Sequence, residues 1–323
     1  MRTARWFGLV FVIACSGTVA GPDESRMAAA PSDNHLPSTP TTPATPTIPT
    51  MPAMPTTPTM TMSPRDAGAQ DAGHKSDAGM PRDTMKLKMP PAGGALDYQL
   101  GGAYEPPSGV KIVSRDRTAK PAAGLYNICY VNGFQAQPDE EDFWMSQHAE
   151  LVLRDSKGQP VIDEDWDELM LDTSTADKRK ALAEIVGGFI DGCAKSGFDA
   201  VEIDNLDSFS RSGGRLSEQN AIDFMALLSK RAHDKGMPIA QKNASELVSK
   251  RAKLGTDFAV AEECNRYDEC GDYTAGYGDQ VFVIEYRKAD FDKGCKAFPS
   301  LSMVLRDVNL STPSGSAYVF EGC

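Results

Sequence analysis

Charged side chains stand at or just after the carboxyl ends of five short apolar segments in the second half of the chain. They are Asp204, Lys242, Glu263, Glu285 and Arg306. Two carboxylates on opposite walls of a cleft can cleave a glycosidic bond, because one protonates the leaving oxygen while the other attacks or activates water. Asp204 and Glu263 are the pair that could carry this chemistry if the fold brings their segments together.

The elements that must position these residues are eight apolar runs bounded by turns. They are LDYQL (96–100), VKIVS (110–114), LYNICYV (125–131), AVEID (200–204), PIAQK (238–242), FAVAE (258–262), VFVIEY (281–286) and LSMVL (301–305). Helical segments lie between the later runs, one over 177–196 that ends at Gly197 and one that follows Ser217. This alternation predicts parallel β/α units, and eight strands favour an α/β fold of the (β/α)8 TIM-type barrel class. No GxGxxG turn follows the first strand, and we expect no cofactor.

Alternation along each strand predicts which side chains face the barrel interior. The residues expected to point inward are Ala200, Glu202 and Asp204; Ala240 and Lys242; Ala259, Ala261 and Glu263; Glu285; and Arg306. Phe258 and Val260 are expected to face the helices. Because barrel enzymes build their sites at the carboxyl ends of the strands, the ionisable groups should converge on one mouth. An alternative is that the acids only form a buried ionic network with Lys242 or Arg306.

Other candidate features are less specific. The aromatic rings of Trp166 and Tyr267 could stack on sugars, or could belong to the core. The acidic run DEDWDE at 163–168 lacks the spacing of an EF-hand and is typical of a solvated loop. No CxxC pair occurs and the chain has four histidines, so we expect no metal site.

The N-terminal part of the chain predicts export and tethering. Arg2 and Arg5 precede a short apolar run, and residues 12–15 read VIAC, which predicts a lipoprotein-type signal peptide over residues 1–20 with cleavage before Cys15 and lipidation of that cysteine. Ordinary secretion is the alternative. Residues 21–95 are rich in Pro, Thr and Met and predict a disordered arm that precedes a folded domain at 96–323. We expect an extracellular or cell-surface bacterial protein that meets the membrane through its N-terminal lipid only.

Charge and cysteine content narrow the partners and the compartment. Residues 96–323 carry 25 basic and 38 acidic side chains, an excess that argues against nucleic acid and suits a cationic substrate. Six cysteines follow Cys15, and an even number in an exported chain predicts disulfides. The expected pairs are Cys264 with Cys270, Cys129 with Cys193, and Cys295 with Cys323, among fifteen possible connectivities. We expect a monomer.

Four segments carry a resemblance to a known family. They are GFDAVEIDNLDSF (197–209), IAQKN (239–243), FAVAEECNRYDEC (258–270) and VIEY (283–286). In order and spacing they resemble glycoside hydrolase family 114, the endo-α-1,4-polygalactosaminidases, whose signatures read like G-[FY]-D-G-V-E-x-D-N, x-K-N and F-x-x-N-E-[QE]-C. The resemblance covers nearly all of 96–323. It departs from the family where the asparagine before the catalytic glutamate is replaced by Ala261-Glu262, and in the first strands.

The resemblance implies a barrel that hydrolyses α-1,4-linked galactosamine polymers, with Asp204 as nucleophile and Glu263 as acid/base of a retaining mechanism, or with these roles exchanged. A retaining mechanism requires carboxyl groups about 5 to 5.5 Å apart. The residues expected to contact the substrate or hold the pair are Glu202, Asn205, Lys242, Asn243, Tyr267, Glu285 and Arg306. Two alternatives are a non-catalytic barrel that binds surface polysaccharide and a glycosidase for another α-linked glycan.

Overall fold

The computed structural model describes residues 87–323. The predicted signal peptide, the predicted lipidation site Cys15 and most of the predicted arm lie outside these residues. The phenol of Tyr126 donates a hydrogen bond of 2.6 Å to the carbonyl of Lys88, and Met89 packs against the apolar cluster inside the sheet. These contacts extend the folded part to the N-terminal side of the expected boundary at residue 96.

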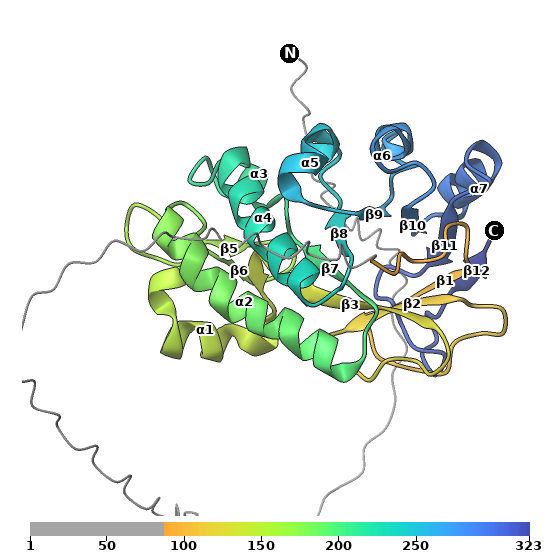
Figure 1. The fold of residues 1–323 in the computed structure, drawn as a ribbon, viewed down its shortest axis with the longest axis horizontal. Coiled ribbons are helices and arrows are strands. Elements are labelled where there is room, and N and C mark those ends of the chain that lie inside the picture. The colour runs from red at the N-terminus through yellow and green to blue at the C-terminus, as the bar shows by residue number, and fades with distance from the viewer. Residues whose placement is uncertain (1–86) are drawn as a thin grey trace, which may run out of the picture. The chain divides into compact units, whose positions relative to one another are not determined.

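All eight expected strands are present and run parallel in one sheet (Figure 1). In sheet order they are β1 (Leu96–Gln99), β2 (Ile112–Asp116), β3 (Tyr126–Asn132), β7 (Ala200–Asp204), β8 (Ile239–Lys242), β9 (Phe258–Glu262), β10 (Val281–Glu285) and β11 (Ser302–Arg306). The short strand β12 (Phe320–Gly322) pairs antiparallel with β11. The architecture is the barrel-like α/β fold that the sequence predicts.

Side chains join the first and the last parallel strand. Arg306 at the end of β11 reaches across to β1, where its Nη1 lies 3.0 Å from Oδ1 of Asp97 and also donates to the carbonyl of Tyr98. Neither charged side chain is exposed. A buried cation without its carboxylate would be strongly destabilising, so this ion pair ties the end of β11 to β1.

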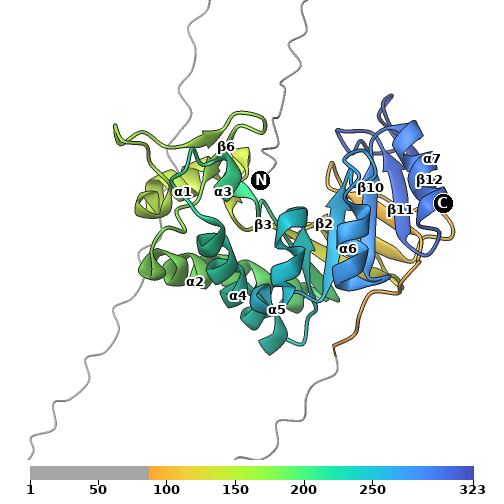
Figure 2. The ribbon, with the colours of Figure 1, turned by 90° about the horizontal axis from the view of Figure 1, so that it is seen from above.

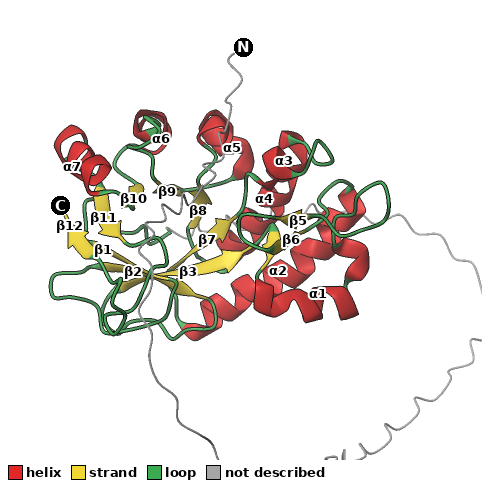
Figure 3. Cartoon of the chain, turned by 180° about the vertical axis from the view of Figure 1, so that it is seen from behind, coloured by secondary structure: helices red, strands yellow, loops and turns green. Residues whose placement is uncertain are grey.

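The helices follow the later strands and cover the outside of the sheet (Figures 1 and 3). They are α2 (Ala176–Ser196), α3 (Ser208–Arg211), α4 (Glu218–Asp234), α5 (Arg251–Leu254) with the 3-10 turn Ser245–Lys250 before it, α6 (Cys270–Tyr277) and α7 (Lys288–Ala297). The ends of the two long helices are as expected. Gly197 closes α2 at a φ of 91°, and Ser217 caps α4 through a capping box. Loops rather than helices connect β1, β2 and β3.

The region between β3 and α2 forms an insertion with its own small sheet and helix. It contains a three-stranded antiparallel sheet of β4 (Gln135–Ala136), β6 (Glu168–Met170) and β5 (Ile162–Asp163), in that order, and the helix α1 (Glu141–Gln147) between the 3-10 turns Pro138–Glu140 and Ala149–Leu151. Figure 2 shows α1, β6 and α3 grouped beyond the end of β3. We refer to residues 133–175 as the insertion.

The apolar clusters reveal which face of each strand is interior. Residues of all eight strands form one cluster inside the sheet, and it includes Ala200, Ala240, Phe258, Val260 and Ile284. This agrees with the expected inward positions in β7 and β8. In β9 the expectation is wrong, because Phe258 and Val260 face the interior.

The opposite face of β9 packs against the neighbouring helices. Ala259 and Ala261 belong to the cluster that contains Tyr273 of α6 and Phe291 of α7. Small alanines let these helices approach the sheet closely, while larger residues fill the interior. Glu262, rather than Glu263, therefore continues the inward series of β9.

The three expected disulfides are all present, Cys129–Cys193, Cys264–Cys270 and Cys295–Cys323. Such bonds form and persist in oxidising compartments, in agreement with the expected export. None of the helices over residues 87–323 combines the length and the hydropathy that crossing a lipid bilayer requires.

Candidate active site

One lysine joins two carboxylates at the carboxyl ends of β7, β8 and β9. Nζ of Lys242 lies 3.1 Å from Oδ1 of Asp204 and 2.9 Å from Oε2 of Glu262. The lysine side chain is almost fully buried, whereas those of Asp204 and Glu262 keep 18% and 24% of their exposure. Two acids that a ligand can reach thus share a cation beneath them.

Asp204 is held as an ionised carboxylate. Tyr130 at the end of β3 donates a hydrogen bond of 2.8 Å to Oδ2, and the backbone N–H of Asn205 donates one of 2.8 Å to Oδ1. Burial on its own would raise the pKa of Asp204, but the charge of Lys242 and these hydrogen bonds outweigh it and hold the pKa below its usual value. The sequence hypothesis that Asn205 orients Asp204 agrees with this contact, which its backbone makes.

Glu262 is fixed by neighbours on both sides. Asn243 forms a reciprocal pair with it, since its Nδ2 donates to Oε2 at 3.3 Å and its Oδ1 accepts from the Glu262 backbone N–H at 2.9 Å. Tyr286, which follows β10, donates to Oε1. Asn243 has a φ of 47°, in the left-handed region that asparagine tolerates better than most residues. Lys242 and Asn243 thus contact the acids of the site, as the sequence hypothesis expects. The glutamate that they contact is Glu262 rather than Glu263.

Glu263 occupies a different environment from its neighbour. It has a φ of 56°, and its carboxylate lies 2.6 Å from Nη1 of Arg266 in an ion pair between residues three positions apart. The expectation that Glu263 continues the inward alternation of β9 is wrong, because the parity of the strand is shifted by one residue. Glu262 holds the position beside Lys242 and Asp204.

Glu202 lies beneath Asp204 inside the barrel. It is fully buried, and it accepts hydrogen bonds from the Tyr98 hydroxyl at 2.5 Å and from the Ser114 hydroxyl at 3.0 Å. Burial raises the pKa of Glu202 to about 7, although Lys242 and the Tyr98 bond act in the opposite direction. Both of its oxygens are occupied from within the fold, so Glu202 supports the pair from below.

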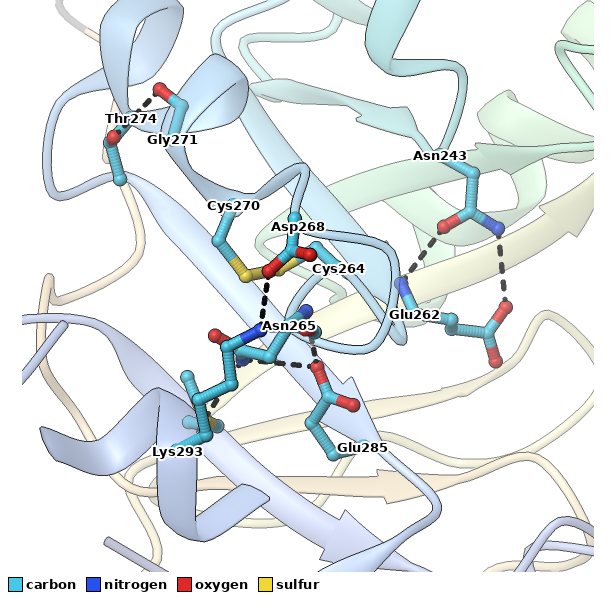
Figure 4. The surroundings of a disulfide bond; sticks show 11 residues. Asn243, Glu262, Cys264, Asn265, Asp268, Cys270, Gly271, Thr274, Glu285 and Lys293 are labelled. Atoms are coloured by element: carbon cyan, nitrogen blue, oxygen red, sulfur yellow. Dashed lines mark hydrogen bonds and ion pairs between the residues drawn. A yellow bond between two sulfur atoms is a disulfide. The ribbon is translucent and has the colours of Figure 1, made fainter. Parts of the chain in front are cut away.

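Glu285 faces away from this site, contrary to the sequence expectation. It lies under the disulfide Cys264–Cys270, where Oε1 accepts from both the backbone and the side-chain nitrogen of Asn265, at 2.9 and 3.0 Å. Figure 4 shows Glu285 directed at Asn265, and Glu262 separately paired with Asn243. The physical reason is the parity of β10, whose residues Phe282 and Ile284 fill the interior. Burial raises the pKa of Glu285.

The disulfide and Glu285 also define the only grouping of metal-ligating atoms found among residues 87–323. The two sulfurs and a carboxylate oxygen of Glu285 lie within 4.8 Å of one another. Sulfurs that are bonded to each other are not thiolates, and the thiolate is the form of cysteine that binds metals. The disulfide instead anchors the loop that follows Glu262.

Two further residues from the sequence hypothesis, Arg306 and Tyr267, have contacts outside the acid pair. Arg306 is inward as expected, but its guanidinium is enclosed, with Nε donating to the carbonyl of Val319 in addition to its bonds with β1. It closes the sheet. Tyr267 is 44% exposed, and the guanidinium of Arg266 lies over its ring with 5.2 Å to the centroid.

The insertion supplies an acid that sequence reasoning missed. Glu168 on β6 is 9% exposed, and its Oε2 accepts from the side-chain amides of Asn132 and Asn205 at 2.9 and 3.1 Å. Burial raises the pKa of Glu168 to about 7, the bond from Asn132 opposes this, and the charges of Asp204 and Asp163 add to it. The acidic run at 163–168 is therefore only partly a solvated loop.

A cleft of about 400 Å³ opens at the carboxyl ends of β1, β2 and β3. Tyr130, whose hydroxyl binds Asp204, lines it together with Gln99, Asp116 and Glu140. The lining contains carboxylates and small residues and no lysine or arginine. Its volume lies within the range of small-ligand sites, about 300 to 1,000 Å³.

A barrel-like sheet with two reachable carboxylates at the carboxyl ends of its strands has the form of a glycoside hydrolase. The sequence profile of glycoside-hydrolase family GH114 matches residues 76–323, and the chain belongs to this family. No curated protein sequence matches the chain.

Solved structures show the same fold. The crystal structure of Aspergillus fumigatus Ega3 in complex with galactosamine superposes with a TM-score of 0.58 at 23% identity, over 75% of this chain and 100% of that one. The glycoside hydrolase domain of PelA from Pseudomonas aeruginosa superposes with a TM-score of 0.50 at 16% identity, over 70% of this chain and 97% of that one.

Proposed function

We propose that the chain hydrolyses an α-1,4-linked, galactosamine-containing polysaccharide with retention of configuration, using Asp204 as nucleophile and Glu262 as acid/base. One observation carries the proposal. Because a single Nζ contacts both carboxylates at 3.1 and 2.9 Å, Oδ1 of Asp204 and Oε2 of Glu262 are no more than about 6 Å apart. Retaining glycosidases place their carboxyl groups about 5 to 5.5 Å apart, whereas inverting enzymes need about 6.5 to 9.5 Å.

The environment of Asp204 supports its role as the nucleophile. Asp204 has a lowered pKa and is ionised at neutral pH, as a nucleophile must be. It attacks the anomeric carbon while Glu262 gives its proton to the leaving glycosidic oxygen, which leaves a glycosyl ester on Asp204 and an ionised Glu262. Glu262 then takes a proton from the water that attacks the anomeric carbon, and Asp204 is released as a carboxylate.

Lys242 contacts both acids, so its charge can stabilise each of them in turn as the negative charge passes from Asp204 to Glu262. Before the first step its ammonium faces the ionised Asp204, and after it the same ammonium faces the ionised Glu262. A fixed cation between the acids therefore stabilises both states without moving, which is electrostatic preorganisation.

The substrate class rests on charge and on similarity. The folded part is strongly acidic, and the mouth holds Asp204, Glu262 and Glu168 against the single ammonium of Lys242. Ega3, which shares the fold, was crystallised with galactosamine. A cationic sugar chain fits these features better than a neutral or anionic one.

A matched pair of neighbouring variants tests the assignment. Glu262→Gln is expected to lower the release of reducing ends from deacetylated galactosamine polymer by a factor of about 100 or more, and Asp204→Asn should do the same. Glu263→Gln makes the same chemical change one residue away and should stay within a few-fold of the wild type. The reverse result for the two glutamates would restore Glu263 as the acid/base.

Three further measurements separate the alternatives. Proton NMR of the first product should show the α anomer, and a β product would exclude the retaining mechanism. Release from N-acetylated and neutral α-linked glycans, assayed in parallel, would identify a different substrate. Unchanged polymer retention by the wild type and a double variant, with no reducing ends released by either, would point to a non-catalytic binding barrel.

A further inference from the structure

We propose that Glu168 is the residue that recognises a positively charged amino group on the sugar attacked by Asp204, and so selects amino sugars over their N-acetylated forms. The inference rests on the proposed function, because it names a contact within the same site. It concerns a residue of the insertion, outside the segments that carry the family resemblance.

The position of Glu168 follows from the contacts of the insertion with the sheet. Asn132 ends β3 and lies opposite Asp204 in the register of β3 with β7. Asn205 follows Asp204 directly. Both asparagine amides donate to Oε2 of Glu168. The carboxylate is therefore fixed beside the ends of β3 and β7, next to the nucleophile.

The other oxygen of Glu168 is left for a ligand. No hydrogen bond to Oε1 is found among residues 87–323, and this oxygen is not one of the enclosed unpartnered atoms, so solvent reaches it. Glu168 also forms no ion pair within the described part of the chain. A carboxylate that is 9% exposed and lacks a cation is a costly group to keep ionised, and a ligand cation would relieve that cost.

The remaining acids of the site are already engaged. Glu202 is fully buried and both of its oxygens accept hydrogen bonds from Tyr98 and Ser114. Glu262 contacts Lys242, and Asp163 pairs with Arg211 at 2.6 Å. Among these carboxylates, Glu168 is the one near Asp204 that retains an open oxygen and has no cation.

The chemistry of the substrate places its amino group within reach. In a 2-amino sugar the nitrogen is bonded to C2, next to the anomeric carbon that Asp204 attacks. The ammonium must therefore lie within a few ångströms of Asp204, and the proposal places it on the side where Asn132 and Asn205 fix Glu168. An N-acetyl group at the same place would bring no charge and would add bulk against a buried carboxylate.

Binding of monosaccharides tests the inference without any turnover. The full chain should bind galactosamine more tightly than N-acetylgalactosamine in calorimetric or NMR titrations. Glu168→Gln, whose carbonyl can still accept from both asparagines, should lower the affinity for galactosamine roughly tenfold or more, the usual effect of losing one charge-assisted hydrogen bond. Its affinity for N-acetylgalactosamine should change little.

Two controls make each outcome decisive. Glu164→Gln removes an exposed charge from the same acidic run and should leave the preference unchanged. Glu168→Asp keeps the charge and should retain part of it. An equal loss for both sugars would show a merely structural role, and an unchanged preference in Glu168→Gln would overturn the inference directly.

The pH profile gives a readout that a structural role would not produce. Glu168 faces Asn132 from β3, Asp204 and Asn205 from β7 and its loop, and Asp163 from β5, which Arg211 of α3 neutralises. Galactosamine affinity of the wild type should fall as the pH drops below about 7, where Glu168 takes up a proton, and Glu168→Gln should lack this change. If the sugar preference is found but the wild type releases no reducing ends, the proposed hydrolysis fails while the recognition stands.

Discussion

The substitution Glu202→Gln should change how the stability of the protein depends on pH. Burial raises the pKa of Glu202 from 4.5 to about 7 in the folded state, while in the unfolded chain the carboxyl has its ordinary pKa. Each pKa unit corresponds to about 1.4 kcal/mol, so the difference between the two states corresponds to about 3 kcal/mol. This free energy is the cost of keeping the fully buried Glu202 ionised.

The direction of the effect follows from proton binding. Between pH 4.5 and about 7 the folded protein holds the Glu202 proton and the unfolded chain releases it. Stability from this group is therefore complete below pH 4.5 and is lost as the pH rises through 7. Glutamine does not titrate, and its amide can accept from Tyr98 and donate to Ser114, which the carboxylate contacts now.

The assay is urea unfolding of the wild type and Glu202→Gln at several values between pH 5 and pH 8, with the disulfides intact. The free energy of unfolding of the variant minus that of the wild type should rise by about 3 kcal/mol across this range. The exposed Glu164→Gln serves as control and should give a constant difference. Parallel profiles for the wild type and Glu202→Gln would refute the reasoning, because they would mean that Glu202 titrates alike in both states.

Three more changes probe the neighbourhood of the acids. Lys242→Met removes the buried cation between two carboxylates and should destabilise the fold by about 3 to 5 kcal/mol in urea unfolding at neutral pH; wild-type stability would contradict the ion-pair geometry. Asn243→Ala removes the reciprocal bonds to Glu262 and should lower kcat about tenfold with little change in KM, whereas a change in KM alone would assign Asn243 to substrate binding. Serine at both Cys264 and Cys270 opens a six-residue loop and should cost only about 2 kcal/mol, while lowering kcat because the loop follows Glu262; unaltered kcat would separate this loop from catalysis.

The positions of the strands and helices are easier to predict from the sequence than the direction in which their side chains point. The eight strands are short apolar runs between turn residues, and the long helices carry a serine cap or a closing glycine, so local chemistry marks both. The face of β7 was also predictable, since Glu202 and Asp204 alternate with Val201 and Ile203. In β9, by contrast, every residue from Phe258 to Ala261 is apolar and buried. A strand that is buried on both faces carries no alternation in polarity. Its sequence therefore does not show which of its residues face the interior.

The insertion was unpredictable for a different reason. Its strands are two or three residues long, too short for a periodic pattern. Glu168 is separated from its partner Asn132 by 36 residues, and its burial depends on that contact. In the run DEDWDE nothing local distinguishes the buried Asp163 and Glu168 from the exposed acids between them.

The register of β8, β9 and β10 in the structure corrects the parity of β9. Paired residues of neighbouring parallel strands point to the same face. Lys242 is paired with Val260, and Val260 is paired with Phe282. If the lysine points inward, as its position at the end of β8 predicts, then Val260 must also point inward, and so must the residue two positions later.

The same rule gives the faces of Glu262 and Glu285. That residue is Glu262, which pairs with the interior Ile284 of β10. Glu285, one position after Ile284, must then face outward together with its partner Leu305. A single inward lysine, together with the strand register, therefore determines which of two adjacent glutamates lies on the same face as Asp204. In a barrel of parallel strands, the paired residues of neighbouring strands together determine which acid faces the interior.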